Sequence, residues 1–206
     1  MQNTSHAVMA QRIEPKESLD FFPTPPWATR ALCEWIAPVD MTSAWEPACG
    51  EGDMVNALSD YFHPVYSSDI TDYGMSHECK DFLKIDEHTK YDWIITNPPF
   101  NLAEKFAYQA LRFANEGVAL LVRTSFLEGI ARYKNLYSKT PPTDILQFTE
   151  RVPIHKGKLA PKGSTATAYC WLVWRKDEIN NGTAFHWIAP CRKNLEFWYD
   201  YGEVEA

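Results

Sequence analysis

The four residues from Asn97 to Phe100, with the sequence Asn-Pro-Pro-Phe, carry the clearest chemical signal in this chain. They directly follow the apolar run 91–96, which is typical of a buried strand. Because proline has no N–H, Pro98 and Pro99 end the strand and leave backbone carbonyls free. The Asn97 side-chain oxygen and the Pro98 carbonyl can then accept both hydrogens of one planar amine, such as the exocyclic amine of adenine, with Phe100 flat against its ring. The alternative is an ordinary strand end closed by a proline turn.

A second chemical signal is the loop 46–53, which has the sequence Glu-Pro-Ala-Cys-Gly-Glu-Gly-Asp and lies between a predicted strand and a predicted helix. Nucleotide-like ligands meet a sheet at such a place. Gly50 and Gly52 have no side chains, so a ligand can approach the backbone closely. A lone Gly-x-Gly is often only a turn, but the acid Glu46 suits a sulfonium and an ammonium better than a pyrophosphate. The loop therefore predicts S-adenosylmethionine as the cofactor rather than a dinucleotide.

Two further acids follow the next predicted strands. Asp69 comes 19 residues after Gly50 at the end of a strand, where a carboxylate can accept hydrogen bonds from both ribose hydroxyls. Asp81 can accept from the adenine amine of the cofactor while Phe82 packs beside the base. The alternative for both acids is a turn or helix cap, and Asp81 could also face water.

These groups require a scaffold that brings strand ends together. A first helix is predicted after the cap residue Thr24 and two prolines that a first helical turn tolerates. The predicted helices are 27–36, 102–113, 126–136 and one that begins with 54–58. The predicted strands are 42–45, 65–68, 92–96 and 117–122, and a weak third element ends at 81–83. Strands that alternate with helices at this spacing indicate parallel pairing in a doubly wound α/β sheet.

The pattern changes after residues 141–142, which are both proline. Strands at 144–148 and 168–174, joined by a basic connection, predict a C-terminal hairpin that gives the mostly parallel sheet one antiparallel edge strand. Residues 1–19 mix polar and charged types without a period and are expected to be flexible. Residues 20–206 are expected to form a single domain.

The composition is that of an ordinary globular domain: 206 residues, 45% hydrophobic and 14% aromatic. No apolar run approaches the about 18 residues that span a bilayer, and the N-terminal residues lack the features of a secretory signal. The five cysteines are scattered and odd in number, which predicts reduced thiols and a cytoplasmic location. The histidines show no metal-ligand spacing with them, so no metal is expected.

The net charge of −7 argues at first against nucleic acid as a partner, but the distribution of charge matters more than the total. The stretch 151–176 carries six cationic side chains with no acid between them. The residues expected to contact nucleic-acid phosphates are Arg151, Lys156, Lys158 and Lys162. The alternative is a solvated loop.

Five sequence elements occur in the order found in adenine-specific DNA methyltransferases. They are 23–26 (Pro-Thr-Pro-Pro), 46–52, Asp69, 81–82 and 97–100. Over roughly residues 20–175, the chain resembles the short single-domain members of that family that phages and mobile elements often encode. The resemblance implies a class I methyltransferase (Rossmann-like) fold, S-adenosylmethionine as cofactor, and methyl transfer to the exocyclic amine of adenine in DNA.

The resemblance also implies site residues. In that family, the segment that matches residues 22–25 of this chain closes over the methionine end of the cofactor. Phe22 and Thr24 are therefore expected to be cofactor contacts. The full set expected to bind the cofactor is Phe22, Thr24, Glu46, Ala48, Gly50, Gly52, Asp69, Asp81 and Phe82, and the catalytic set is Asn97, Pro98, Pro99 and Phe100. Because a base cannot be reached inside a duplex, the adenine must be flipped out or single-stranded.

The chain departs from the family after Trp174, because about 30 residues cannot form a target-recognition domain. Specificity then comes from inserted loops, is low, or is supplied by a partner or an oligomer. His155, Lys156 and Tyr169 are candidates for holding the flipped base. The competing functions are methylation of an RNA adenine, a cytosine amine or a protein glutamine, and a non-catalytic subunit of the same fold that binds nucleic acid or a partner.

Overall fold

The computed structural model describes residues 21–75, 77–86, 89–159, 163, 165–178 and 182–201. The N-terminal segment 1–19 and Lys162 lie outside the described residues, so the expectations about them are not tested.

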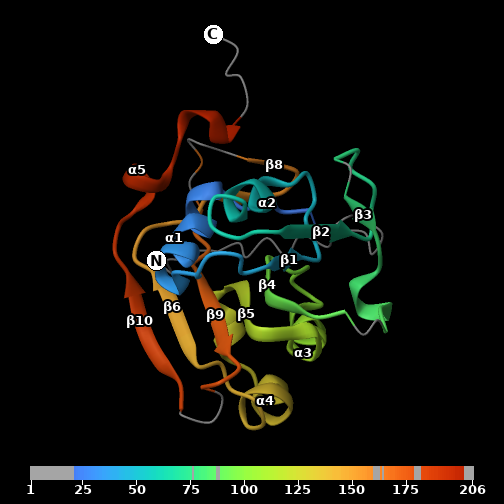
Figure 1. Ribbon diagram of the computed structural model, residues 1–206. Helices are drawn as coiled ribbons and strands as arrows, with labels where there is room; N and C mark the ends of the chain where they lie inside the picture. Colours follow the sequence, from blue (N-terminus) through green and yellow to red (C-terminus); the bar gives the residue numbers. More distant parts are fainter. Residues whose placement is uncertain are drawn as a thin grey trace, which may run out of the picture.

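Eight strands of the described chain form one sheet in the order β10-β6-β9-β5-β4-β1-β2-β3 (Figure 1). Their bounds are β1 Ala44–Glu46, β2 Val65–Asp69, β3 Glu78–Cys79, β4 Tyr91–Thr96, β5 Ala114–Arg123, β6 Asp144–Phe148, β9 Tyr169–Arg175 and β10 Ala184–Ile188. Neighbouring strands pair in parallel except at β9, which is antiparallel to both β5 and β6. The prediction of a doubly wound, mostly parallel α/β sheet with an antiparallel C-terminal pair is confirmed.

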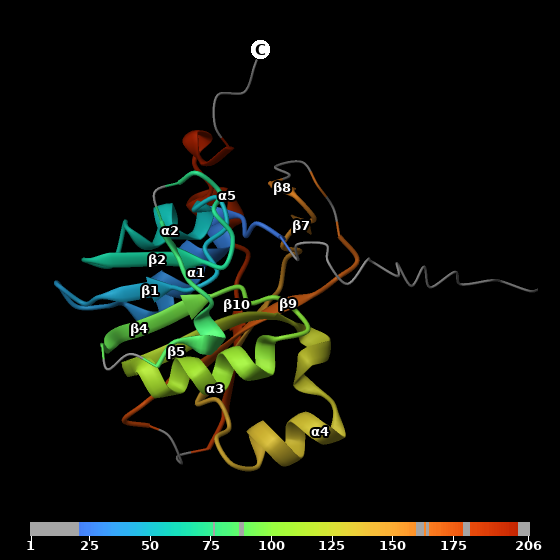
Figure 2. The same ribbon diagram turned by 90° about the vertical axis from the view of Figure 1, so that its right-hand side faces the viewer.

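Helices cover both faces of the sheet (Figure 2). Helices α1 (Pro26–Ile36) and α2 (Asp53–Leu58) lie on one face, and α3 (Ala103–Phe113) lies on the other with the segment 124–137. The strands supply apolar residues to both faces because successive side chains alternate: Ile95 packs toward α1 and α2, and Ile94 packs toward α3. The central strands are therefore buried on both sides, which explains their almost continuous apolar sequence.

Two smaller pieces complete the structure. A separate ribbon pairs β7 (Ile154–His155) with β8 (Lys158–Leu159) in antiparallel orientation. After β10, the chain forms α5 (Arg192–Leu195) and a 3-10 turn (Trp198–Tyr201). Among the described residues, no helix is both long and apolar enough to cross a membrane.

Several details differ from the sequence predictions. The antiparallel strand β9 lies inside the sheet rather than at its edge, and the edge beyond β6 is occupied by β10, which was not predicted. The predicted helix 126–136 is broken into a 3-10 turn (Thr124–Leu127), the short α4 (Ile130–Arg132) and a wider π turn (Tyr133–Tyr137). Gly129, with φ of 125°, separates the first two pieces, because this backbone conformation cannot belong to a right-handed helix.

Candidate active site

One cleft gathers most of the predicted site residues. Strand β1 lies between β2 and β4, and the helices that follow β1 and β4 cover opposite faces of the sheet (Figure 2). Ligands of open α/β sheets bind at this kind of switch point, beside the carboxyl ends of the strands. The predicted residues that line the cleft are Phe22, Thr24, Glu46, Ala48, Gly50, Asp69, Asp81, Phe82, Asn97 and Pro99. Gly52, Pro98 and Phe100 are not among its lining residues.

The loop 46–53 is held by a hydrogen bond to Asp69, the last residue of β2. The Gly50 N–H donates to Asp69 Oδ2 at 2.9 Å, and the Thr71 N–H donates to Asp69 Oδ1 at 3.0 Å. An ionised carboxylate has about four acceptor sites, so each oxygen keeps capacity for a hydroxyl in the cleft. Asp69 thus organises the loop in addition to lining the cleft.

A side chain at Gly50 would be strained and would displace the ring of Phe21. The φ of Gly50 is 52°, and a Cβ built there would lie 2.5 Å from the ring of Phe21. Gly52 also has a positive φ of 88°, but a Cβ there would meet only Met75 Cε at 4.0 Å. The first glycine is therefore required by close packing as well as by its backbone conformation, whereas the second is required by its backbone conformation as the residue before α2.

Glu46 is the most unusual ionisable group of the cleft. Its side chain is 1% exposed, Oε1 accepts the Ala48 N–H at 3.0 Å, and Oε2 has no hydrogen-bond partner in the described part of the chain. Burial raises the pKa of Glu46 to about 8, although the nearby Thr96 hydroxyl and the bond from the Ala48 N–H oppose the shift. A buried carboxyl with an unpaired oxygen is suited to a ligand that brings its own positive charge.

Asp53 is a cleft residue that the sequence prediction missed. It is the first residue of α2, and burial raises its pKa to about 6. Its place directly after Gly52 in the loop was the available signal. With Glu46, Asp69 and Asp81 against the single described cation Lys80, it makes the lining of the cleft mostly acidic, which favours a cationic ligand over a phosphate.

The Asn97 amide is held by the segment that precedes α1. We call residues 21–24 the strap. Asn97 Nδ2 donates to the Phe22 carbonyl at 2.8 Å and to Thr24 Oγ1 at 3.0 Å. Asn97 Oδ1 is buried and has no partner among the described residues. Thr24 does not cap α1, because the residue before that helix is Pro25 and no side-chain cap bond forms there.

The motif after Asn97 turns directly into α3. The Pro99 carbonyl accepts the Leu102 N–H at 2.8 Å and is thus used by the turn. For the Pro98 carbonyl, no backbone partner is found among the described residues, as expected of a carbonyl that the missing proline N–H leaves outside the ladder.

Asp81 and Phe82 have structural partners of their own. Asp81 Oδ1 accepts the Leu83 N–H at 3.1 Å, and Oδ2 pairs with Lys84 at 3.0 Å. Asp81 therefore caps the 3-10 turn Phe82–Lys84, which is the alternative considered for it. Phe82 packs edge-on against Trp45 with ring centroids 5.2 Å apart and belongs to the core beside α3.

Phe100 lies beside the cleft with its own aromatic and cationic neighbours. Its ring centroid is 4.9 Å from that of Phe22 and 6.4 Å from that of Tyr169. The guanidinium of Arg123 sits 3.9 Å from the Phe100 centroid. Arg123, the last residue of β5, was not predicted, and only its position at the carboxyl end of an apolar strand could have indicated it.

The basic ribbon β7–β8 reaches the strap. The Gly157 N–H, between Lys156 and Lys158, donates to the Phe21 carbonyl at 2.9 Å. His155 Nε2 is buried and has no partner among the described residues. Arg151 donates to the Ala166 carbonyl at 3.1 Å, so part of its donor capacity supports the chain itself. The described chain contains no cluster of His, Cys, Asp and Glu that could hold a metal ion.

Comparison with known proteins gives matches in structure and not in sequence. No protein-family model and no curated protein matches the chain. A proposed RNA methyltransferase from Pyrococcus horikoshii has a TM-score of 0.60 at 14% identity, covering 79% of this chain and 90% of that one. A modification subunit of a proposed type I restriction enzyme from Vibrio vulnificus has a TM-score of 0.57 at 17% identity, covering 86% and 49%. The M protein of the type I restriction enzyme EcoKI has a TM-score of 0.52 at 15% identity, covering 76% and 44%.

These likenesses establish the fold. Together with the sheet order, they confirm the predicted class I methyltransferase (Rossmann-like) fold. The chain spans about half the length of the two type I subunits that it matches.

Proposed function

We propose that this chain transfers the methyl group of S-adenosylmethionine to the exocyclic amine of adenine in DNA, on the premise of its class I methyltransferase fold. The observation that carries the proposal is the Asn97 amide. Its nitrogen is bound by the strap, and its buried oxygen has no partner in the described chain. A buried acceptor left unpaired costs about 1–3 kcal/mol and needs an explanation; its position at the cleft, beside the proline motif, supports a hydrogen bond from the substrate.

The cleft residues fit S-adenosylmethionine. The unpaired Glu46 Oε2 and the acidic neighbours Asp53 and Asp69 suit a ligand with a sulfonium and an ammonium, and the remaining acceptor sites of Asp69 suit ribose hydroxyls. The bound cofactor supplies an electrophilic methyl group. Ala48 and Gly50 line the cleft beside these acids and leave room for a ligand against the backbone.

The residues that follow β4 bind the substrate amine by hydrogen bonds. Asn97 Oδ1 and the Pro98 carbonyl accept its two hydrogens, which shifts the nitrogen toward a tetrahedral and more nucleophilic shape. Phe100 stacks on the base, and proximity supplies much of the rate. Since Arg123 lies over Phe100 in this structure, the entering base displaces its guanidinium from the ring.

DNA is favoured as the substrate by the family resemblance of the motifs and by the basic ribbon next to the strap. Two structural neighbours are modification subunits of type I restriction enzymes, which supports DNA and a partner that supplies specificity. A third neighbour is a proposed RNA methyltransferase, so an RNA adenine is the second candidate.

Incubation with tritiated S-adenosylmethionine and matched DNA or RNA, followed by nucleoside analysis, separates the two candidate substrates. Label in N6-methyladenosine from RNA alone would overturn the proposal.

The direct test of the site is Asn97→Ala. Loss of one positioned hydrogen-bonding group should cost about 3 kcal/mol in the activation barrier, or about two orders of magnitude in kcat, while the affinity for the cofactor changes little. Asn56→Ala is the matched control, because Asn56 is exposed on α2. Transfer by Asn97→Ala within a few-fold of the unmodified protein would contradict the role of Asn97.

A further inference from the structure

Thr24 occupies an unexpected place in the site. The residue is 3% exposed and stands where the strap meets α1, 73 residues before Asn97 in the sequence. Its hydroxyl oxygen lies 3.0 Å from Asn97 Nδ2. The sequence resemblance makes Thr24 a contact of the cofactor, but its hydrogen bond in the structure goes to the residue that meets the substrate.

The orientation of the Asn97 amide follows from these contacts. The Phe22 carbonyl can only accept a hydrogen bond, so the amide atom 2.8 Å away from it must be the nitrogen. The second hydrogen of that nitrogen points at Thr24 Oγ1. A rotation of the amide by half a turn would place Oδ1 against the Phe22 carbonyl, two acceptors in contact. The Phe22 carbonyl thus decides which amide atom faces the strap, and the Thr24 hydroxyl, the second partner, restricts the plane of the amide.

We propose that Thr24 is a positioning residue for the transfer reaction, whose hydroxyl fixes the plane of the Asn97 amide so that Oδ1 is reserved for the substrate amine. The inference rests on the proposed function and adds to it a residue that acts through Asn97. With only the Phe22 carbonyl as partner, the amide could rotate about the remaining hydrogen bond. Two acceptors at an angle remove that freedom, and small errors in position are expensive in catalysis.

The strap is itself anchored at three other points, which makes it a suitable reference for the amide. The Phe21 carbonyl accepts the Gly157 N–H at 2.9 Å, the Phe21 ring packs on Gly50, and the Phe22 ring contacts Phe100. The strap is therefore in contact with the ribbon β7–β8, the loop 46–53 and the motif 97–100.

The test compares Thr24→Val with Thr24→Ser. Valine keeps the shape of threonine and removes the acceptor, whereas serine keeps the hydroxyl. We expect Thr24→Val to lower kcat at least about fivefold at saturating cofactor and DNA, the loss expected for about 1 kcal/mol of positioning, with the dissociation constant of S-adenosylmethionine within about twofold. Thr24→Ser should restore kcat to within about twofold of the unmodified protein. If Thr24 acts only on the cofactor, Thr24→Val will weaken cofactor binding and leave the saturated kcat unchanged, which would overturn the inference.

Thr29→Val is the matched control for loss of a buried hydroxyl. Thr29 lies in α1, is fully buried, and its Oγ1 has no partner among the described residues. This change should leave kcat unaltered, and its melting temperature provides the reference for that of Thr24→Val. A fall in kcat of Thr29→Val as large as that of Thr24→Val would assign the effect to packing and contradict the positioning role.

A second measurement needs no turnover. In the unliganded protein, both side-chain amide protons of Asn97 are hydrogen-bonded to the strap, so they should exchange slowly with water. NMR with an Asn97→Asp sample for assignment should find one of these protons exchanging faster in Thr24→Val and protected again in Thr24→Ser. Unchanged exchange in Thr24→Val would overturn the inference.

The outcomes also separate the two proposals. Methyl transfer by Asn97→Ala would contradict the proposed function. A loss of kcat in Asn97→Ala with no loss of kcat in Thr24→Val would contradict this inference alone.

Discussion

At the scale of single residues, we expect Glu46 to make cofactor binding depend on pH. Its pKa of about 8 means that the carboxyl is mostly protonated at pH 7 in the empty cleft. A cationic ligand favours the ionised form, so binding must release a proton. Below pH 8, each unit of pH lowered costs about 1.4 kcal/mol for ionising Glu46.

We therefore expect the affinity for S-adenosylmethionine to rise close to tenfold per unit between about pH 6 and pH 7, and to level off toward pH 8. Titration calorimetry at pH 7 in two buffers of different ionisation enthalpy measures the protons released, and nearly one is expected. Glu46→Gln should remove nearly all of the release at pH 7 and leave only the weaker pH dependence due to Asp53, whose pKa is about 6. Binding without proton release in the unmodified protein would exclude Glu46 as the group that meets the cation.

At the scale of loops and strands, the two glycines of the 46–53 loop should respond differently to alanine. Both have positive φ, so both changes carry a backbone strain of about 1–2 kcal/mol. Only Gly50→Ala also collides with Phe21, which must move and loosen the strap. Urea unfolding should find Gly50→Ala less stable than Gly52→Ala, and cofactor affinity should fall further in Gly50→Ala. Equal effects of the two changes would mean that the Phe21 contact is unimportant.

The ribbon β7–β8 carries the prediction about nucleic acid. If Lys156 and Lys158 meet phosphates, each adds about 0.9 to the slope of log affinity against log salt. Replacing both with alanine should flatten that slope by about two units, and cofactor binding should hardly change.

Titration of labelled DNA at several salt concentrations measures the slope. The matched control replaces Lys90 and Lys139, which precede β4 and β6 and so lie at the opposite end of the sheet from the cleft. It makes the same change in net charge. An unaltered slope in the ribbon variant, or an equal change in both variants, would make the ribbon an ordinary solvated loop.

The elements with a strong local pattern were predictable, and those that depend on distant contacts were not. Strand β4 and helix α3 have an apolar run and a helical period that define them locally. Strand β10 was missed because its face with Phe185 and Trp187 is exposed, so it lacks the pattern of a buried strand. The bond between Thr24 and Asn97 joins residues 73 positions apart, and no local pattern encodes it. Asp81 caps a turn as its residue type allows, a role that sequence alone could not separate from cofactor binding.

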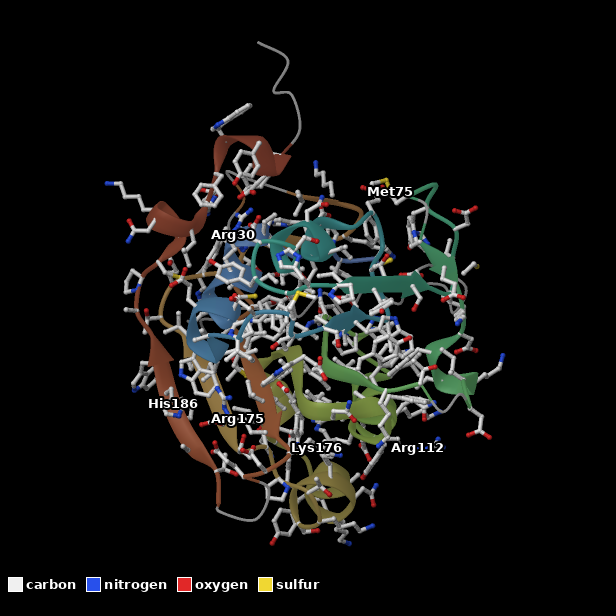
Figure 3. The ribbon with its side chains drawn as sticks, in the orientation of Figure 1. Arg30, Met75, Arg112, Arg175, Lys176 and His186 are labelled. Atoms are coloured by element: carbon white, nitrogen blue, oxygen red, sulfur yellow. The ribbon has the colours of Figure 1, made fainter. Side chains whose placement is uncertain are left out.

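At the scale of the whole molecule, Arg30 joins the C-terminal segment to the first helix. It donates to both oxygens of Asp200, at 2.9 Å each, and to the Leu195 carbonyl at 3.0 Å. The Arg30 and Asp200 side chains are only 3% and 2% exposed. Figure 3 shows Arg30 beside the C-terminal segment and Arg112 far from it.

Asp200→Ala should therefore destabilise the protein by about 1.5–3 kcal/mol, because the buried Arg30 guanidinium loses two charge-assisted hydrogen bonds but keeps its pair with Asp60 Oδ2 at 2.9 Å. Asp86→Ala is the matched control: its pair with Arg112 is 91% and 60% exposed, and loss of an exposed pair costs about 0–1 kcal/mol. Chemical unfolding followed by fluorescence measures both. Similar losses of stability in the two variants would contradict the anchoring role of Arg30.

The position of β9 has a consequence for how the chain can be synthesised and folded. Its two neighbours in the sheet, β5 and β6, both precede it in the sequence, and β6 pairs only with β9 and β10 among the described strands. When a growing chain has emerged only as far as β6, one edge of β5 has no hydrogen-bonded neighbour. Strand β6 also lacks β9, the strand that joins it to the rest of the sheet. Sheet closure must therefore wait until β9 has left the ribosome, which makes it a late, long-range step that leaves the β5 edge exposed to aggregation until then.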